Sequence, residues 1–100
     1  MEPIFHIADK ATWEAAIPGG EYAQSTRDQS LVDVGFIHCS YRHQVDSVLE
    51  NFYADVSTPL VLLTIEPALL DAPVKVEDGF PHIYGALNTG AVIEVGDPHA

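Results

Sequence analysis

One segment, Leu60–Ile65, constrains the fold more than any other part of the sequence. It reads Leu-Val-Leu-Leu-Thr-Ile, so apolar side chains fall on both faces of an extended chain. A strand with one face in solvent alternates between apolar and polar residues, whereas a strand covered on both faces does not. The segment therefore predicts a central, fully buried strand.

Two helices are predicted to pack against this strand. Asp9 is typical of a helix N-cap, and Pro18-Gly19-Gly20 ends the helical pattern that follows it. Ser40 is predicted to cap the clearest helix of the chain, which runs from Tyr41 to about Tyr53. The apolar stripe of this second helix consists of Tyr41, Val45, Val48, Leu49 and Phe52.

The remaining segments are short and predict mainly strands and turns. Extended segments are predicted at 3–8, 21–24, 36–39, 74–77, 82–84 and 91–95, with a loop over 27–34 that can include one helical turn, a helical turn at 67–70 and a turn at 78–81. This order is not a regular βαβ alternation, so it favours an α+β domain with a curved, mixed or antiparallel sheet. The length fits a single domain, 1–100, in which 96–100 forms a frayed tail.

The charge balance argues against nucleic acid and membrane as partners. The chain has 15 acidic and 4 basic residues, a formal net charge of −11, and its lysines and arginines are scattered. Binding to a nucleic-acid backbone needs clustered basic side chains that displace counterions. Its longest apolar run is much shorter than the roughly 20 residues that cross a bilayer. A small-molecule or nucleotide ligand and a protein partner both stay compatible with these features.

Cysteine content and the N-terminal residues predict a cytoplasmic protein. Cys39 is the single cysteine, so no internal disulfide can form. The N-terminus shows neither a basic start nor an apolar signal stretch.

Three of the five histidines lie inside short apolar segments and are the candidate catalytic residues. They are His6 in Ile-Phe-His-Ile, His38 in Phe-Ile-His-Cys and His82 in Pro-His-Ile-Tyr. A titratable ring among apolar neighbours must find a hydrogen-bond partner or shift its pKa. Each ring can therefore be either a structural histidine satisfied by a carbonyl or part of a shared cleft.

Strand alternation connects His38 to Ser40 and separates it from Cys39. In an extended 36–40, Phe36, His38 and Ser40 share one face, while Ile37 and Cys39 share the other. A Cys–His nucleophile is therefore not expected. Ser40 is a candidate ligand-binding residue as well as a helix cap, since a helix N-terminus also attracts anions.

Three further residues are candidate ligand contacts. Tyr22 follows a Gly-Gly turn and Tyr84 precedes Gly85, and either ring can stack on a planar ligand or pack as a buried aromatic. Glu77 ends an apolar strand and is either a functional carboxylate or a solvated strand end.

A metal site is not predicted. Three histidines with water form a known catalytic zinc arrangement, but no two of His6, His38 and His82 have i, i+2 or i, i+4 spacing. The His-Glu-x-x-His signature is absent as well.

Several segments together closely resemble the bacterial domain-of-unknown-function family 952. The resemblance rests mainly on Gly35-Phe36-Ile37-His38-Cys39-Ser40 and Phe80-Pro81-His82-Ile83-Tyr84-Gly85, with Phe5-His6-Ile7 and the Leu60–Ile65 run, and it covers nearly the whole chain. That family has no assigned activity. The resemblance implies a split sheet similar to the ADP-ribosylation fold, in which two small sheets surround a nicotinamide cleft.

The resemblance also implies roles for individual residues. In ADP-ribosyltransferases a histidine of the first strand holds the nicotinamide ribose, a role that His6 matches by position. A tyrosine stacks on the nicotinamide ring, which Tyr22 or Tyr41 matches, and a late glutamate aids transfer, for which Glu77 lacks a matching motif. The chain also looks like RNA 2′-phosphotransferases, but those rely on several arginines where this chain has only Arg27 and Arg42.

Two functions therefore remain open. The first is binding of NAD or a related nucleotide, with or without transferase activity. The alternative is a ligand-sensing or protein-interaction module that keeps the fold without catalysis. Substrate, reaction and oligomeric state are not determined by the sequence.

Overall fold

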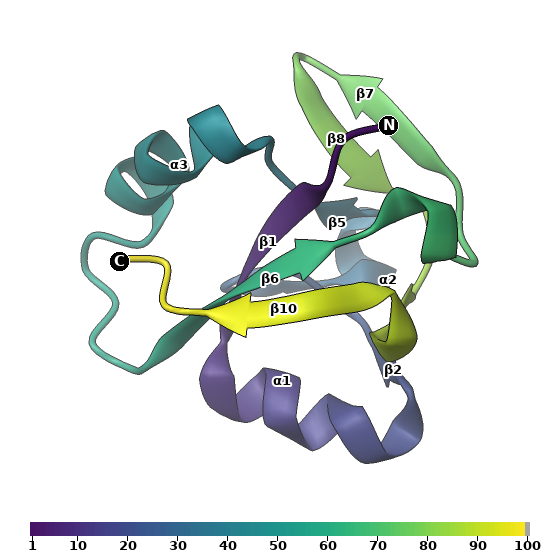
Figure 1. Ribbon diagram of the computed structural model, residues 1–100. Helices are drawn as coiled ribbons and strands as arrows, with labels where there is room; N and C mark the ends of the chain where they lie inside the picture. Colours follow the sequence, from purple (N-terminus) through teal and green to yellow (C-terminus); the bar gives the residue numbers. More distant parts are fainter. Residues whose placement is uncertain (100) are drawn as a thin grey trace.

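Two three-stranded antiparallel sheets form the frame of the molecule in the computed structural model, which describes residues 1–99 (Figure 1). The first sheet has the order β1-β6-β10 and the second the order β5-β8-β7. Their strands are β1 Ile4–Asp9, β6 Leu60–Ile65, β10 Val92–Gly96, β5 Ile37–His38, β8 Phe80–Ile83 and β7 Val74–Glu77. The predicted α+β class is confirmed. Of the two predicted kinds of sheet, mixed or antiparallel, the structure has the antiparallel one, because every strand pair within residues 1–99 is antiparallel.

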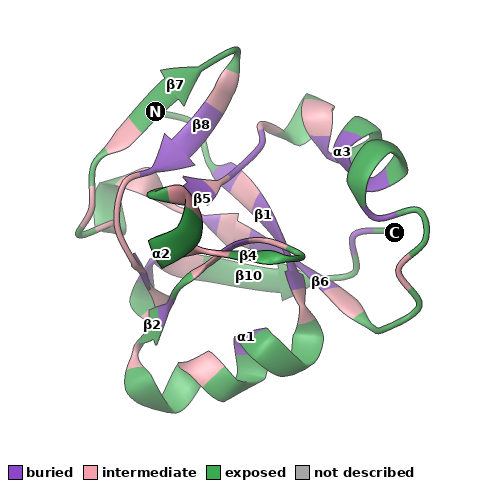
Figure 2. Ribbon diagram, turned by 180° about the vertical axis from the view of Figure 1, so that it is seen from behind, coloured by how far each residue is buried: buried purple, intermediate pink, exposed green. Residues whose placement is uncertain are grey.

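The central position of β6 explains why its sequence is apolar on both faces. Val61, Leu63 and Ile65 belong to the main core, which also contains the side chains of Ile4, Trp13, Ile37, Ile83 and Leu87. Leu62 points the other way, into a smaller core beneath helix α3, Val45–Phe52. Because β1 and β10 flank β6 on either side, the predicted central strand is confirmed. Figure 2 shows the buried segments of β1, β5 and β8 close together, while helix α1, Lys10–Ala16, and strands β7 and β10 are largely exposed.

Helix α1, Lys10–Ala16, follows β1 directly. The carboxylate of Asp9 accepts a hydrogen bond from the backbone N–H of Thr12 at 3.1 Å, so the predicted N-cap is confirmed. The chain then forms a 3₁₀ turn, Ile17–Gly19, and leaves it at Gly20 with φ 77°. Trp13 is buried in the main core, whereas Ile17 lies beyond the helix and is half exposed.

Helix α3, Val45–Phe52, is shorter than predicted and does not begin at Ser40. The backbone of Ser40 pairs with Phe5 instead, and a 3₁₀ turn, Arg42–Gln44, precedes the helix. The side chain of Gln44 accepts a hydrogen bond from the N–H of Tyr41 at 2.8 Å at the start of that turn, whereas no side chain caps α3 itself, so the predicted Ser40 cap is wrong. The buried residues of the stripe are Val45, Val48 and Leu49, each contributing roughly 2 kcal/mol of hydrophobic stabilisation. Phe52 is exposed.

The remaining elements are short. Two small antiparallel pairs join β2, Glu21–Tyr22, to β9, Leu87–Asn88, and β3, Gln24–Thr26, to β4, Gln29–Ser30. Helix α2 spans Leu31–Val34, and two further 3₁₀ turns span Pro67–Leu69 and Thr89–Ala91. The predicted 27–34 loop therefore contains β4 and α2, because Ser30 forms a capping box with Asp33.

One other detail differs from the sequence predictions. The β7–β8 turn is limited to Asp78 and Gly79, both with positive φ, and the strand resumes at Phe80. Within the segment predicted as a tail, Gly96 pairs with Leu62 and Pro98 is buried. Ala100 lies outside the described residues.

Candidate functional site

The two sheets meet at a single pair of residues and then separate, and we call this place the split. Phe5 of β1 and Ser40 exchange both backbone hydrogen bonds, each at 2.7 Å. Continued antiparallel pairing would place Ile7 opposite His38. Instead, the carbonyl of His38 accepts a hydrogen bond from the Nδ1 of His6 at 2.6 Å. The His6 side chain thus takes the place of a backbone donor where β1 and β5 diverge.

His6 is buried, and both of its ring nitrogens have partners. Its Nδ1 donates to the His38 carbonyl, so Nε2 carries no proton in the neutral ring. Nε2 accepts a hydrogen bond from the Tyr22 hydroxyl at 3.2 Å. The pKa of His6 is lowered to about 4, mainly by burial; the hydrogen bond to the His38 carbonyl raises it and the nearby His38 ring lowers it, both by less. The ring is therefore neutral at pH 7 and fixed in one tautomer.

His38 lies beside His6 but keeps a half-buried ring that is open to a cavity. The pKa of His38 is lowered, mainly by burial and to a smaller extent by the charge of neighbouring His82. Its ring centroid lies 5.5 Å from that of His82, because the two residues are directly paired across β5 and β8. A neutral imidazole of this kind can both donate and accept a hydrogen bond from a ligand hydroxyl or amide.

His82, Glu77 and Tyr84 form a second polar group on the β7–β8 hairpin. The Nδ1 of His82 lies 2.9 Å from Oε1 of Glu77, and the Tyr84 hydroxyl donates to the same oxygen. These bonds, with Tyr84 the larger contributor, hold the pKa of Glu77 below its usual range. Phe36 stacks on the His82 ring at 4.1 Å between centroids. Glu77 is thus occupied by the protein's own donors.

A cavity of about 580 Å³, the split cavity, opens beside the split. Its polar lining includes His6, His38 and Ser40 from the two diverging strands, and Asn51 from α3. Its other lining residues are Ile7, Thr26, Arg27, Asp28, Gln29, Val48, Phe52, Tyr53 and Asp55. The predicted shared face of His38 and Ser40 therefore borders a real cavity, while Cys39 faces the main core.

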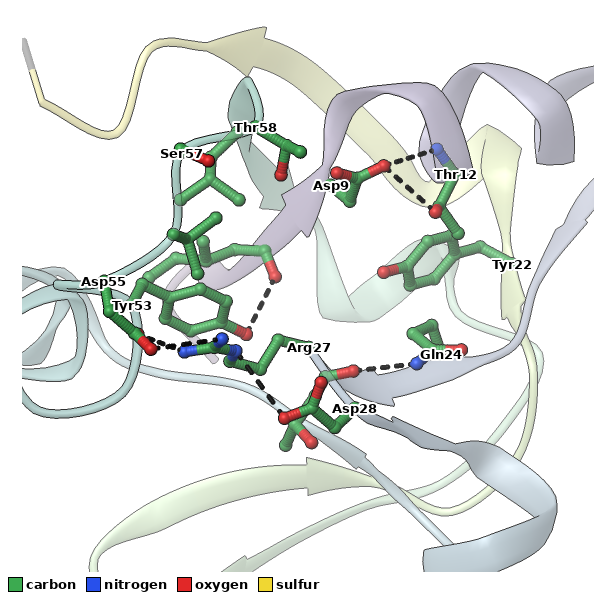
Figure 3. A pocket seen from close by; sticks show the side chains of 14 residues that line it. Asp9, Thr12, Tyr22, Gln24, Arg27, Asp28, Tyr53, Asp55, Ser57 and Thr58 are labelled. Atoms are coloured by element: carbon green, nitrogen blue, oxygen red, sulfur yellow. Dashed lines mark hydrogen bonds and ion pairs between the residues drawn. The ribbon is translucent and has the colours of Figure 1, made fainter.

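A second cavity of about 400 Å³, the side cavity, lies next to the first (Figure 3). Tyr22 lines it, together with Asp9 and Thr12 at the start of α1. Its other lining residues are Ile7, Gln24, Thr26, Arg27, Asp28, Tyr53, Asp55, Val56, Ser57, Thr58 and Leu60. Four of the seven candidate residues line one of these cavities: His6, His38 and Ser40 line the split cavity, and Tyr22 lines the side cavity.

The other three candidates do not reach these cavities. His82, Glu77 and Tyr84 line neither of them, although His82 touches the edge of the site through its contact with His38. The buried Tyr22 ring packs edge-on against His6, and burial raises the pKa of its hydroxyl. Tyr22 is therefore placed to support His6 more than to stack on a ligand.

The structure adds three residues that the sequence analysis did not single out for the site, namely Arg27, Tyr53 and Asp55. Arg27 sits in the β3–β4 turn, where its guanidinium bonds the carboxylate of Asp55 beyond α3. The Tyr53 hydroxyl donates to the Ile7 carbonyl at 3.5 Å on the open edge of β1. No sequence motif surrounds these residues. The only feature of the sequence that could have pointed to Arg27 is that the chain has just four basic residues.

Cys39 lies in the main core rather than in either cavity. Burial raises the pKa of the Cys39 thiol, whose sulfur lies 3.8 Å from the carbonyl of Ile37. Within residues 1–99, no group of three or more His, Cys, Asp or Glu side chains is arranged to hold a metal ion.

None of the helices described in residues 1–99 is long and apolar enough to cross a membrane.

Fold and site together define a small antiparallel α+β domain with a histidine-lined cavity at the junction of two sheets. The sequence pattern of the family described as "Protein of unknown function (DUF952)" matches residues 7–95, so the chain belongs to that family. No curated protein matches the chain.

Solved structures of one protein, CC0527 from Caulobacter crescentus, are similar to this chain. Its crystal structure, and that of a double mutant, are each 28% identical with a TM-score of 0.76, covering 95% of this chain and 84% of that one. Its solution NMR structure is 30% identical with a TM-score of 0.66, covering 97% of this chain and 84% of that one. The fold is therefore shared across most of both chains.

Proposed function

We propose that this protein binds a nicotinamide nucleotide or a related nucleotide in the split cavity. The observation that carries the proposal is that His6, His38 and Ser40, contributed by two diverging strands, border one cavity of about 580 Å³. This volume falls in the range of roughly 300–1,000 Å³ that is usual for small-molecule sites. The resemblance to the ADP-ribosylation fold, whose nicotinamide cleft lies between two small sheets, supports the same ligand class by analogy.

The polar groups of the cavity suit a ribose and an amide. The neutral His38 ring and the Asn51 side chain each offer a donor and an acceptor, and Ser40 offers a hydroxyl. Val48 and Phe52 supply the apolar surface against which a planar ring packs. His6 fixes the wall rather than reaching for the ligand, because both of its nitrogens are already bonded.

A non-catalytic ligand-binding or interaction module is favoured over a transferase by one observation. Transfer of ADP-ribose in the similar enzymes is aided by a late glutamate, and Glu77 is bonded to His82 and Tyr84 on a hairpin that lines neither cavity. We therefore place binding first and transferase activity second.

A thermal-shift titration with NAD, ADP-ribose and nicotinamide tests the proposal. A ligand at 100 times its Kd stabilises the folded state by about 2.7 kcal/mol, which raises the melting temperature of a domain of this size by roughly 10–20 °C. His38→Ala should abolish the shift, while His43→Ala, a histidine outside both cavities, should preserve it. Absence of any shift at millimolar ligand would sink the proposal. Transfer of ADP-ribose from NAD to an acceptor by the wild type, with release of nicotinamide, would instead establish the transferase alternative.

A further inference from the structure

Arg27 lies in the wall that separates the two cavities. It lines both the split cavity and the side cavity, and among residues 1–99 no other arginine or lysine lines either of them. Thr26 and Asp28, on each side of it in the β3–β4 turn, also line both cavities. A group bound to this guanidinium therefore has space on two sides.

The guanidinium is held by groups on the opposite wall (Figure 3). Its Nη1 donates to the Phe52 carbonyl at 3.1 Å and to the Asp55 carboxylate, and Nη2 lies 3.5 Å from the second oxygen of Asp55. The Nε of Arg27 also lies 3.6 Å from a carboxylate oxygen of Asp28. The planar, two-pronged pairing with Asp55 has the geometry in which arginine binds a carboxylate or a phosphate.

This ion pair is exchangeable because water reaches it. The Asp55 side chain is 77% exposed and that of Arg27 is 34% exposed. Exposed ion pairs contribute little to stability, since the charges are well solvated when they separate. An incoming anion with the same two-oxygen geometry can replace Asp55 without disturbing the core.

The positions of the two cavities point to the shape of the ligand. A molecule made of two nucleosides joined by an anionic linker places one body on each side of Arg27 and the linker on the guanidinium. A single nucleoside fills one cavity and leaves the other empty. Resting on the proposed function, we propose that Arg27 binds the diphosphate of a dinucleotide whose two halves occupy the split and side cavities, and that Asp55 occupies Arg27 when the ligand is absent.

The surrounding carboxylates explain why Asp55 must leave. Asp28 and Asp55 border both cavities, and Asp9 borders the side cavity. With Asp55 in place, a diphosphate meets a neutralised arginine among further negative charge. Removing the charge of Asp55 frees the guanidinium for the anion and should therefore tighten binding.

Calorimetric titration of the full chain with NAD and with nicotinamide riboside tests this inference. The riboside has one nucleoside and no phosphate. Asp55→Asn should bind NAD about tenfold more tightly than the wild type, and Arg27→Gln at least about tenfold more weakly, as expected for one charge-assisted contact. The affinity for the riboside should stay within about twofold in both variants. Melting curves establish that each variant is folded.

Asp28→Asn is the matched control. It removes the same charge from the same turn, but Asp28 makes only one long contact with Arg27. Its gain in NAD affinity should therefore be clearly smaller than that of Asp55→Asn. An equal gain would mean that general electrostatics is responsible and would overturn the role of Asp55.

The outcomes separate this inference from the proposed function. If the riboside binds but NAD affinity is insensitive to Arg27→Gln and Asp55→Asn, the dinucleotide site is rejected while nucleotide binding stands. If neither ligand binds the wild type or any variant, both are rejected. Riboside binding that tightens in Asp55→Asn as much as NAD binding does would also overturn the assignment of a phosphate to Arg27.

Discussion

The split between β1 and β5 and the β7–β8 hairpin each present a histidine on an antiparallel strand, yet they satisfy it in different ways. At the split, His6 is enclosed, its nitrogens bond a carbonyl and a tyrosine hydroxyl, and burial lowers its pKa to about 4. On the hairpin, His82 faces Glu77, whose side chain is 46% exposed. One region holds a neutral ring in place, whereas the other pairs a ring with a carboxylate that water can reach.

The comparison shows what each region can contribute. Neutral partners around His6 make it part of the wall, so the polar groups that the split cavity offers a ligand include those of His38, Ser40 and Asn51. The hairpin group is self-contained, because Glu77 already accepts from both His82 and Tyr84. Similar sequence contexts thus lead to a wall residue in one place and a paired residue in the other.

The largest expected effect comes from removing His6. His6→Ala leaves the His38 carbonyl and the Tyr22 hydroxyl without partners in a buried space, so the free energy of unfolding should fall by about 3 kcal/mol. His82→Ala should cost about half as much, since Glu77 can bond to water. Urea denaturation of both variants measures the difference. Equal losses, or severe unfolding of His82→Ala, would remove the distinction and make His82 a core residue.

The pH dependence of stability should carry the signature of His6. Its folded pKa of about 4 lies below the ordinary 6.5, so the unfolded state binds the proton first as the pH falls. The stability tied to neutral His6 is complete above pH 6.5 and is lost toward pH 4, about 2 kcal/mol of it by pH 5. Denaturation at pH 7 and pH 5 measures the loss, which His6→Gln should lack. The same loss in that variant would assign it to other groups.

Tyr22→Phe isolates the hydroxyl that bonds His6. The ring remains in the main core, but Nε2 of His6 is left as a buried acceptor without a donor, at a cost of about 1.5 kcal/mol. Tyr53→Phe is the control, because its hydroxyl makes only a long, 3.5 Å bond to Ile7. Thermal unfolding of the two proteins should rank Tyr22→Phe as the less stable, and the reverse order would contradict the bonding described for His6.

Glu77→Gln should have the smallest effect of these changes. Its contacts lie at a solvent-exposed carboxylate, where screening makes ion pairs weak. The melting temperature should therefore drop less than in Tyr22→Phe, and NAD binding should be unchanged because Glu77 lines neither cavity. A loss of NAD affinity in this variant would show that the hairpin does belong to the binding site.

Much of the local structure could be predicted because it depends on neighbouring residues. Asp9 caps α1 through a bond to Thr12, three residues away, and the alternation of 36–40 directs His38 and Ser40 to one face. The start of α3 was mispredicted for the opposite reason. The backbone of Ser40 is taken by Phe5, a residue 35 positions earlier, and no local signal announces that pair.

The candidate site was predictable only in part for the same reason. His6, His38 and Ser40 stand out as polar residues in apolar segments, and they do border the split cavity. Arg27 and Asp55 are surface residues in ordinary sequence contexts, and they meet only because the β3–β4 turn lies across from the end of α3. Contacts between distant, exposed residues leave no pattern in a single sequence.

By itself, the sequence determined that β6 is central, that the domain is α+β and that three histidines sit among apolar side chains. These follow from the period of apolar residues and from capping, which act over a few positions. The tertiary structure alone decided that β1 and β5 share one bonded pair and then part, and that His6 fills the gap between them. Those facts depend on which strands meet, and chain pairing over tens of residues is set by packing of the whole core rather than by any local preference.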